Sequence, residues 1–324
     1  MHKHLIVGIS GQDGAYLASH LLRLGQTVIG TSRSSSLIAS PNLLRLGIAD
    51  AVQVFTCAPG DENGIARLIE THEIDRVYLL SGQSSVGLSF TEPVETYLGL
   101  VTPALTILDL IRRRFPEVRL LYAGSGEVFC PDDGMPFTER SRHSPKSPYA
   151  AAKSAAMALV DTYRDVYKVF AANAILFNHE SPLRPTTFVI PKIVAAAARI
   201  AKGSPERLPL GNIDVSRDWG WAPDYVDAMC RIVEHTTASN FIVATGHTET
   251  IRHAINLIAG HFGIDLMARC DFPTALLRPC DAPTVSASPA KIAATLGWRA
   301  QTSFPEMIRL LCHTAADSVH RPPS

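Results

Sequence analysis

Short apolar runs alternate with longer segments of helical periodicity through the first half of the chain. Runs rich in β-branched residues predict strands, whereas apolar residues spaced three and four apart predict helices. Strands are expected at Leu5–Ile9, Thr27–Gly30, Ala51–Thr56, Arg76–Ser81, Arg119–Ala123 and Ala171–Phe177. Helices are expected at Tyr16–Leu24, Asn63–His72, Thr102–Arg114 and Ser147–Tyr167. Such alternation predicts an α/β fold with a parallel sheet covered by helices on both faces.

Beyond about residue 178 the pattern changes, because prolines break the apolar periodicity into short pieces. These prolines are Pro182, Pro185, Pro191, Pro205, Pro209 and Pro223. We therefore expect one domain at residues 1–177 and a smaller, irregular C-terminal lobe at residues 178–324. Some later segments, such as Asn240–Ala244, are expected to return to the sheet of the first domain.

Composition excludes several classes of partner. Thirty basic and thirty acidic residues give a formal net charge of zero, so neither nucleic acid nor an anionic membrane is an expected partner. No apolar run approaches the roughly 18 residues of a membrane span. The six cysteines are scattered without a C-x-x-C pair, which favours reduced thiols, a cytoplasmic protein and no metal site.

A glycine-rich turn directly follows the first predicted strand. Gly8, Gly11 and Gly14 form a G-x-x-G-x-x-G pattern that opens the next helix. Glycines in such a turn permit a tight bend and a close approach to a pyrophosphate, which the helix N-terminus attracts. The pattern predicts a doubly wound, Rossmann-type dinucleotide-binding domain, and leaves the C-terminal lobe mainly for substrate.

The end of the second strand indicates which dinucleotide is bound. Residues 30–33 contain no carboxylate for a ribose 2′-hydroxyl, but they include Arg33, which suits a 2′-phosphate. We therefore expect NADP as the cofactor, with NAD as the alternative if Arg33 is only a solvated surface residue.

A serine, a tyrosine and a lysine follow in an order that suits proton transfer. Ser125 comes directly after a strand, and Tyr149 and Lys153 lie four residues apart on one helix face. A lysine ammonium beside a phenol is expected to favour the phenolate, and hence a usable base. Glu127 provides a second, separate acid/base group. These four residues are the predicted catalytic groups.

Several further motifs extend over the chain. They include Tyr16-Leu17-Ala18 after the glycine turn, Gln83-Ser84-x-Val86, Asn178-His179-Glu180-Ser181-Pro182, Arg217-Asp218-Trp219-Gly220 and Leu296-Gly297-Trp298. In these motifs the chain resembles the GDP-mannose 4,6-dehydratases, a family of extended short-chain dehydrogenases/reductases. It differs at Cys57–Asp61, where the family has Gly-Asp-Leu-Thr-Asp, and at Ser125, where the family usually has Thr. The resemblance is therefore to a divergent member.

The resemblance implies a lyase of deoxysugar biosynthesis that converts GDP-mannose or a related GDP-sugar to its 4-keto-6-deoxy product. In that reaction Tyr149 takes the C4 hydroxyl proton while C4 is oxidised, and Glu127 then removes the C5 proton. Water leaves from C6, to which hydride returns. The resemblance also implies a homodimer or homotetramer.

The same resemblance assigns binding residues. Cofactor contacts are implied for Gly8, Gly11, Gln12, Asp13, Gly14, Arg33, Leu80, Gln83, Ser84, Tyr149, Lys153, His179 and Arg184. Substrate contacts are implied for Ser84, Ser125, Glu127, Asn178, Lys192, Arg217 and Arg278.

Two other functions use part of this residue set. A 4-keto-sugar reductase or a 4-epimerase needs the serine, tyrosine and lysine, but no carboxylate to remove a C5 proton. A catalytically silent NADP-binding sensor or assembly protein needs neither Tyr149 nor Lys153. Net consumption of NADPH distinguishes the reductase from the dehydratase.

Overall fold

The computed structural model describes residues 2–33, 40–130, 136–276 and 282–318. Its main sheet has seven strands in the order β11-β6-β5-β4-β1-β2-β3, and every pairing in it is parallel. The strands are β1 (Lys3–Val7), β2 (Thr27–Ser32), β3 (Gln53–Thr56), β4 (Arg76–Leu79), β5 (Arg119–Ala123), β6 (Ala171–Leu176) and β11 (Phe241–Val243). This order confirms the predicted Rossmann-type fold.

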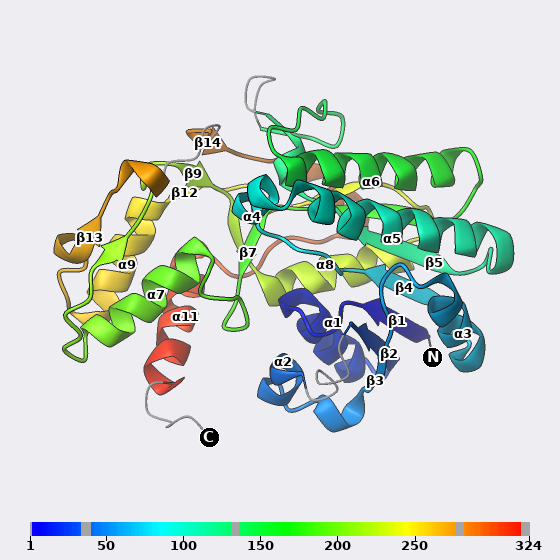
Figure 1. Ribbon diagram of the computed structural model, residues 1–324, viewed down its shortest axis with the longest axis horizontal. Helices are drawn as coiled ribbons and strands as arrows, with labels where there is room; N and C mark the ends of the chain where they lie inside the picture. Colours follow the sequence, from blue (N-terminus) through cyan, green and yellow to red (C-terminus); the bar gives the residue numbers. More distant parts are fainter. Residues whose placement is uncertain (1, 34–39, 131–135, 277–281, 319–324) are drawn as a thin grey trace.

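Helices cover both faces of this sheet (Figure 1). One face carries α1 (Gln12–Arg23) and α8 (Ala222–Glu234), and the other carries α3 (Glu62–His72), α5 (Pro93–Arg114) and α6 (Pro148–Asp165). Successive residues of β1 point to opposite faces, so Leu5 and Val7 join one apolar core while Ile6 joins the other. Burial on both faces explains why the strands are continuous apolar runs.

The C-terminal residues build a second lobe with its own apolar core. Its helices α7 (Val189–Ile200), α9 (Ile251–Phe262) and α11 (Phe304–Ser318) lie together at one end of the molecule (Figure 1). Short strands connect them: β7 (Asn178–Glu180), β8 (Leu208–Pro209), β9 (Ser216–Arg217), β10 (Trp219–Trp221), β12 (Glu249–Thr250), β13 (Cys270–Asp271) and β14 (Thr284–Val285). The remaining helices are α2 (Pro41–Arg45), α4 (Val86–Thr91) and α10 (Ala290–Leu296).

This lobe is more helical than its prolines predict. Pro191 lies in the first turn of α7, and Pro223 lies in the first turn of α8. A proline is tolerated there because the first backbone N–H groups of a helix have no intrahelical partner. Two of the six prolines that we interpreted as breaks therefore lie in first helical turns, and α8 packs against the main sheet.

Helix α5 begins at Pro93, well before the predicted start at Thr102. It is the one described helix whose length and composition would suit a membrane span. Half of its most apolar 18-residue stretch is buried inside the protein, however. Its inner residues, such as Leu108 and Ile111, pack in the core beneath the sheet. The other apolar residues of α5 therefore lie on the outer face of the helix, away from the core.

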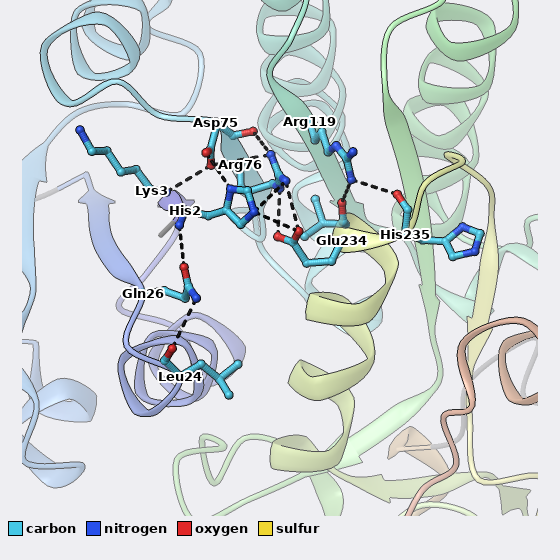
Figure 2. A network of polar contacts seen from close by, with 10 residues as sticks. His2, Lys3, Leu24, Gln26, Asp75, Arg76, Arg119, Glu234 and His235 are labelled. Atoms are coloured by element: carbon cyan, nitrogen blue, oxygen red, sulfur yellow. Dashed lines mark hydrogen bonds and ion pairs between the residues drawn. The ribbon is translucent and has the colours of Figure 1, made fainter.

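Ion pairs tie the end of α8 to the amino ends of the central strands (Figure 2). Arg76 at the start of β4 donates from Nε to Glu234 over 2.9 Å, and its side chain is only 8% exposed. Arg119 at the start of β5 donates to the carbonyl oxygens of Val233 and His235, each over 3.0 Å. These contacts lie at the amino ends of the strands. The predicted catalytic residues follow the carboxyl ends, at the opposite edge of the sheet.

The described cysteines, Cys57, Cys130, Cys230, Cys270 and Cys312, are all buried. Burial raises the pKa of the Cys57 thiol to about 11 and that of Cys230 to about 12. Among the described residues, no group of three His, Cys, Asp or Glu side chains could hold a metal ion.

Candidate active site

A pocket of about 460 Å³ opens where β1, β4, β5 and β6 end, between the main sheet and the C-terminal lobe. A volume of this size suits a small-molecule ligand, and strand ends in a parallel sheet are where such ligands bind. The sheet side of the pocket is lined by Asp13, Leu80, Gln83, Ser84, Ser125, Glu127, Tyr149, Lys153, Asn178, His179 and Glu180. The lobe side is lined by Arg184, Phe188, Lys192, Asn212, Arg217 and Trp219.

The glycine turn joins β1 to α1 beside this pocket. Gly8 has a φ of +100°, which a side chain rarely adopts, and a Cβ on Gly14 would lie 2.4 Å from the Gly8 carbonyl oxygen. A Cβ on Gly11 would meet only that oxygen, at an ordinary 3.5 Å. The protein itself therefore does not require a glycine at position 11, and no side chain caps the N-terminus of α1 there. Both facts suit a phosphate group lying against the turn.

Tyr149 and Lys153 lie in the first two turns of α6, whose N-terminus is capped by the Ser147 hydroxyl. Both side chains are buried, and Ser125, which follows β5, lies close enough to Tyr149 to lower the pKa of its phenol. The Lys153 ammonium donates to the Ala123 carbonyl oxygen over 2.7 Å. The helix and the strand thus bring together the three residues that the sequence predicted as neighbours.

The electrostatics of Tyr149 differ from the expectation. Burial raises the pKa of its phenol to about 12, and the nearby Ser125 hydroxyl opposes this rise only in part. Lys153 lies 5.9 Å from the centre of the Tyr149 ring, and burial lowers the pKa of its own ammonium to about 8. In this structure the phenol is therefore protonated at neutral pH, and Lys153 does not make it a base by itself.

Glu127 enters the pocket from the short 3₁₀ turn Gly126–Val128. Its backbone N–H donates to the Ser125 hydroxyl over 3.3 Å, which fixes the turn directly after β5. The residue is exposed, and its charge contributes to raising the pKa of Tyr149. A solvated carboxylate therefore lies close to the buried phenol as a separate acid/base group.

The glycine turn is hydrogen-bonded to the start of the C-terminal lobe. His179 Nε2 lies 3.0 Å from both carboxylate oxygens of Asp13, and its Nδ1 lies 2.7 Å from the Phe177 carbonyl oxygen. The Ser181 hydroxyl donates to Gln12 Oε1 over 2.7 Å. Because both imidazole nitrogens face acceptors, both must donate, and His179 is a cation paired with Asp13. We call these four residues, Gln12, Asp13, His179 and Ser181, the junction.

The pKa values of the pair reflect this contact. Burial alone would raise the pKa of Asp13, but the charge and hydrogen bond of His179 lower it to about 2. Burial alone would lower the pKa of His179, but the charge and hydrogen bond of Asp13 raise it above 6.5. The junction therefore holds two opposite charges over most of the acid range.

The binding residues that the sequence predicts lie in different parts of the structure. Arg33 is exposed at the end of β2, while Leu80, Gln83 and Ser84 follow β4 along the pocket. Lys192 donates to the Pro209 carbonyl oxygen over 2.5 Å. Arg217 donates to the Ser216 and Ala282 carbonyl oxygens. Arg278 lies outside the described residues.

Some lining residues were missed from the sequence. Glu180 was noticed only as part of the N-H-E-S-P motif, although it shares a face of β7 with Asn178 by strand alternation. Phe188, Val215, Ile251 and Leu276 also line the pocket, and nothing in their local sequence pattern indicates a site.

The sequence was compared with known proteins. The sequence model of the family described as GDP-mannose 4,6 dehydratase matches residues 5–311. A relative named GDP-mannose 4,6 dehydratase 2, from Caenorhabditis elegans, is 35% identical, over 94% of this chain and 86% of the relative.

Solved structures share the fold. RMD from Pseudomonas aeruginosa, complexed with NADPH, has a TM-score of 0.81 at 23% identity and covers 98% of this chain and 100% of its own. A dTDP-glucose 4,6-dehydratase from Bacillus anthracis, in complex with NAD, has a TM-score of 0.83 at 17% identity. The match covers 97% of this chain and 96% of that protein's chain.

Loss of the junction charge should lower stability in a pH-dependent way. The raised pKa of His179 stabilises the fold below 6.5 and this contribution fades as pH rises, whereas the lowered pKa of Asp13 stabilises it above 3.8. We expect Asp13→Asn to lower the free energy of unfolding by about 3 kcal/mol near pH 5–6 and by less at pH 9. Denaturant unfolding at both pH values measures this.

Asp214→Asn is the matched control. Asp214 pairs with Arg252 on the surface, so its loss should cost at most about 1 kcal/mol and should not change between the two pH values. An Asp13→Asn defect that is as large at pH 9 as at pH 6 would contradict the ion pair.

Proposed function

The chain belongs to the GDP-mannose 4,6-dehydratase family, and we propose that it converts GDP-mannose or a related GDP-sugar to the 4-keto-6-deoxy product. The observation that carries this proposal is Glu127, an exposed carboxylate beside the buried Ser125–Tyr149 pair in one pocket. One base is then available for a hydroxyl proton, and a second group is available for a C–H proton. A reductase or an epimerase would need only the first.

A nicotinamide cofactor fits the residues present, and NADP is the form we propose. The glycine turn leaves room at Gly11 for a phosphate, and the N–H groups of α1 begin there without a side-chain cap. Leu80, Gln83, Ser84, Tyr149, Lys153, His179 and Arg184 line the pocket beyond the turn and would hold the rest of the molecule. When bound, the cofactor supplies a hydride acceptor, later a hydride donor and, in its oxidised form, a positive charge.

Tyr149 acts first in this proposal, as the base that removes the proton from the C4 hydroxyl. A phenol with a pKa of about 12 cannot do this at neutral pH unless positive charge lies near it. The Ser125 hydroxyl holds the same substrate oxygen, and Lys153 contributes its charge from the next turn of α6.

Glu127 acts second. Oxidation at C4 acidifies the proton on C5, and the exposed carboxylate removes it. Glu127, now protonated, can donate that proton to the C6 hydroxyl, which leaves as water. The cofactor, when bound, would supply the hydride that C6 takes up, and a proton from solvent at C5 would complete the 4-keto-6-deoxy sugar with no net use of the cofactor. Lys192 and Arg217 on the lobe side of the pocket would hold the sugar nucleotide, together with Ser84 and Asn178 on the sheet side.

We also propose that two copies of the chain pair through α5 and α6. Val94, Tyr97 and Leu98 on the outer face of α5 are 66%, 47% and 52% exposed, and they border a shallow apolar groove with Pro148 and Ala151. Exposed apolar residues at this helical spacing suit a self-complementary interface between copies.

Residues 34–39, which follow Arg33, lie outside the described residues.

The dehydratase assignment is tested by Glu127→Gln. Because Tyr149, Ser125 and Lys153 remain, oxidation at C4 should still occur while dehydration falls by about 10²–10⁴. The variant should therefore accumulate reduced cofactor, visible as nicotinamide absorbance, and release little 4-keto-6-deoxy product.

Tyr149→Phe is the paired variant for this experiment. It should fall equally far in turnover but accumulate no reduced cofactor, because the first proton is no longer removed. Near-normal dehydration by Glu127→Gln would eliminate Glu127 as the base, and turnover of Tyr149→Phe within threefold of wild type would eliminate Tyr149.

The cofactor assignment is tested by Arg33→Met. We expect this variant to bind NADP(H) about tenfold or more weakly, because a charge-assisted contact to the 2′-phosphate is lost, and to bind NAD(H) as before. Titration of both cofactors measures this, with Arg309→Met, whose partner is Glu306 on α11, as the control. Tighter binding of NAD(H) than NADP(H) by the wild type would refute the assignment.

The interface is tested by Leu98→Glu, read as molecular mass in sedimentation. The wild type should have twice the 35.1-kDa chain mass or a larger multiple, and the variant should shift towards the single chain. Leu44→Glu, at a residue that is 58% exposed on α2, should leave the mass unchanged. A monomeric wild type would refute the pairing.

A further inference from the structure

Glu180 and Arg184 bring opposite charges into the pocket without satisfying each other. Glu180 is 3% exposed, and its Oε2 atom has no hydrogen-bond partner among the described residues. The nearest cationic atom is Arg184 Nε at 3.7 Å, and that nitrogen also has no hydrogen-bond partner within the described part of the chain. Two buried, unsatisfied polar atoms facing each other are unusual in a folded protein, and they suggest a contact that a ligand completes.

The surrounding structure fixes both side chains. Glu180 ends β7, which pairs with β10, and Arg184 follows a turn in which its backbone N–H donates to the Ser181 carbonyl oxygen. The guanidinium carbon of Arg184 lies 3.6 Å from the centre of the Phe188 ring, so the group stacks on that ring. Since its Nε edge faces Glu180, the terminal nitrogens are the part that can meet a ligand in the pocket.

The charges around Glu180 come from three elements. His179 on β7 and Arg184 are cationic, Asp13 on α1 is anionic, and β10 contributes no charged residue. Burial raises the pKa of Glu180 to about 7, although the charges of Arg184 and His179 oppose that rise. Near neutral pH the carboxyl group is therefore populated in both protonation states.

We propose that Glu180 is a positioning residue, which holds the Arg184 guanidinium for the diphosphate of a nucleotide and takes up a proton when that diphosphate binds. An anion on Arg184 cancels the positive potential that keeps Glu180 ionised, so the buried carboxylate becomes costlier and binds a proton. This inference rests on the proposed function, in which both the cofactor and the sugar nucleotide carry a diphosphate. The cofactor is the ligand proposed for Arg184 above, and the sugar nucleotide is the alternative that the test separates from it.

The test is the pH dependence of binding, measured separately for NADP⁺ and for GDP-mannose at pH 6 and pH 8. If a proton is taken up, the wild type should lose affinity for one of the two between pH 6 and pH 8, by roughly threefold to tenfold relative to Glu180→Gln. Glu180→Gln keeps the shape but cannot titrate. The 2′-phosphate of NADP⁺ titrates in both proteins, so their difference reports Glu180 alone.

Further variants separate positioning from a general loss of structure. Arg184→Met should bind the same ligand about tenfold more weakly and should lose the pH effect, because the diphosphate contact itself is gone. Glu206→Gln, which breaks a Glu–Arg pair with Arg199 on the surface, should match the wild type in both arms. Circular dichroism confirms that each variant is folded.

The outcomes are distinct. An effect in the NADP⁺ arm assigns Arg184 to the cofactor, and an effect in the GDP-mannose arm assigns it to the substrate. If the wild type binds these ligands and Glu180→Gln shows the same affinities and pH dependence, the inference is wrong and the proposed function stands. If the wild type binds neither ligand, the proposed function fails, and the inference fails with it.

Discussion

The ion pair between Asp13 and His179 is the contact on which the site depends. It joins a residue in the first turn of α1, directly after the central strand β1, to a residue on β7, which pairs with β10 in a separate two-stranded sheet. The Gln12–Ser181 hydrogen bond lies beside it, so the glycine turn and the first strand of the C-terminal lobe form one buried polar unit. These contacts hold the start of the lobe against the turn, at the side of the pocket where both segments line it.

Much of the sheet could be predicted because its strands are buried on both faces and are therefore continuous apolar runs. Arg119–Ala123 is observed as predicted, and the other strands shift by a few residues at their ends. The start of α5 was missed because its first turns carry Val94 and Leu98 on an exposed face, which does not follow core periodicity. Helices α7 and α8 were missed because a proline in a first helical turn has the same local signal as a break.

For the site, local spacing placed Tyr149 and Lys153 on one helix face, and the order of the strands placed Ser125 and Glu127 beside them. The junction could not be predicted in the same way, since Asp13 and His179 are 166 residues apart and no periodicity links them. The raised pKa of Tyr149 also needed the structure, because desolvation depends on what surrounds the phenol. The burial of Glu180 beside Arg184 needed the structure for the same reason.

In one pocket the enzyme oxidises C4 of the sugar nucleotide, removes the C5 proton and regenerates its cofactor. The most direct measurement is mass and NMR analysis of the product that the wild type forms from GDP-mannose in heavy water, with cofactor absorbance followed in parallel. The account predicts a 4-keto-6-deoxy sugar with one deuterium at C5 and no net change in NADPH. Stoichiometric consumption of NADPH, or a product without deuterium at C5, would contradict it.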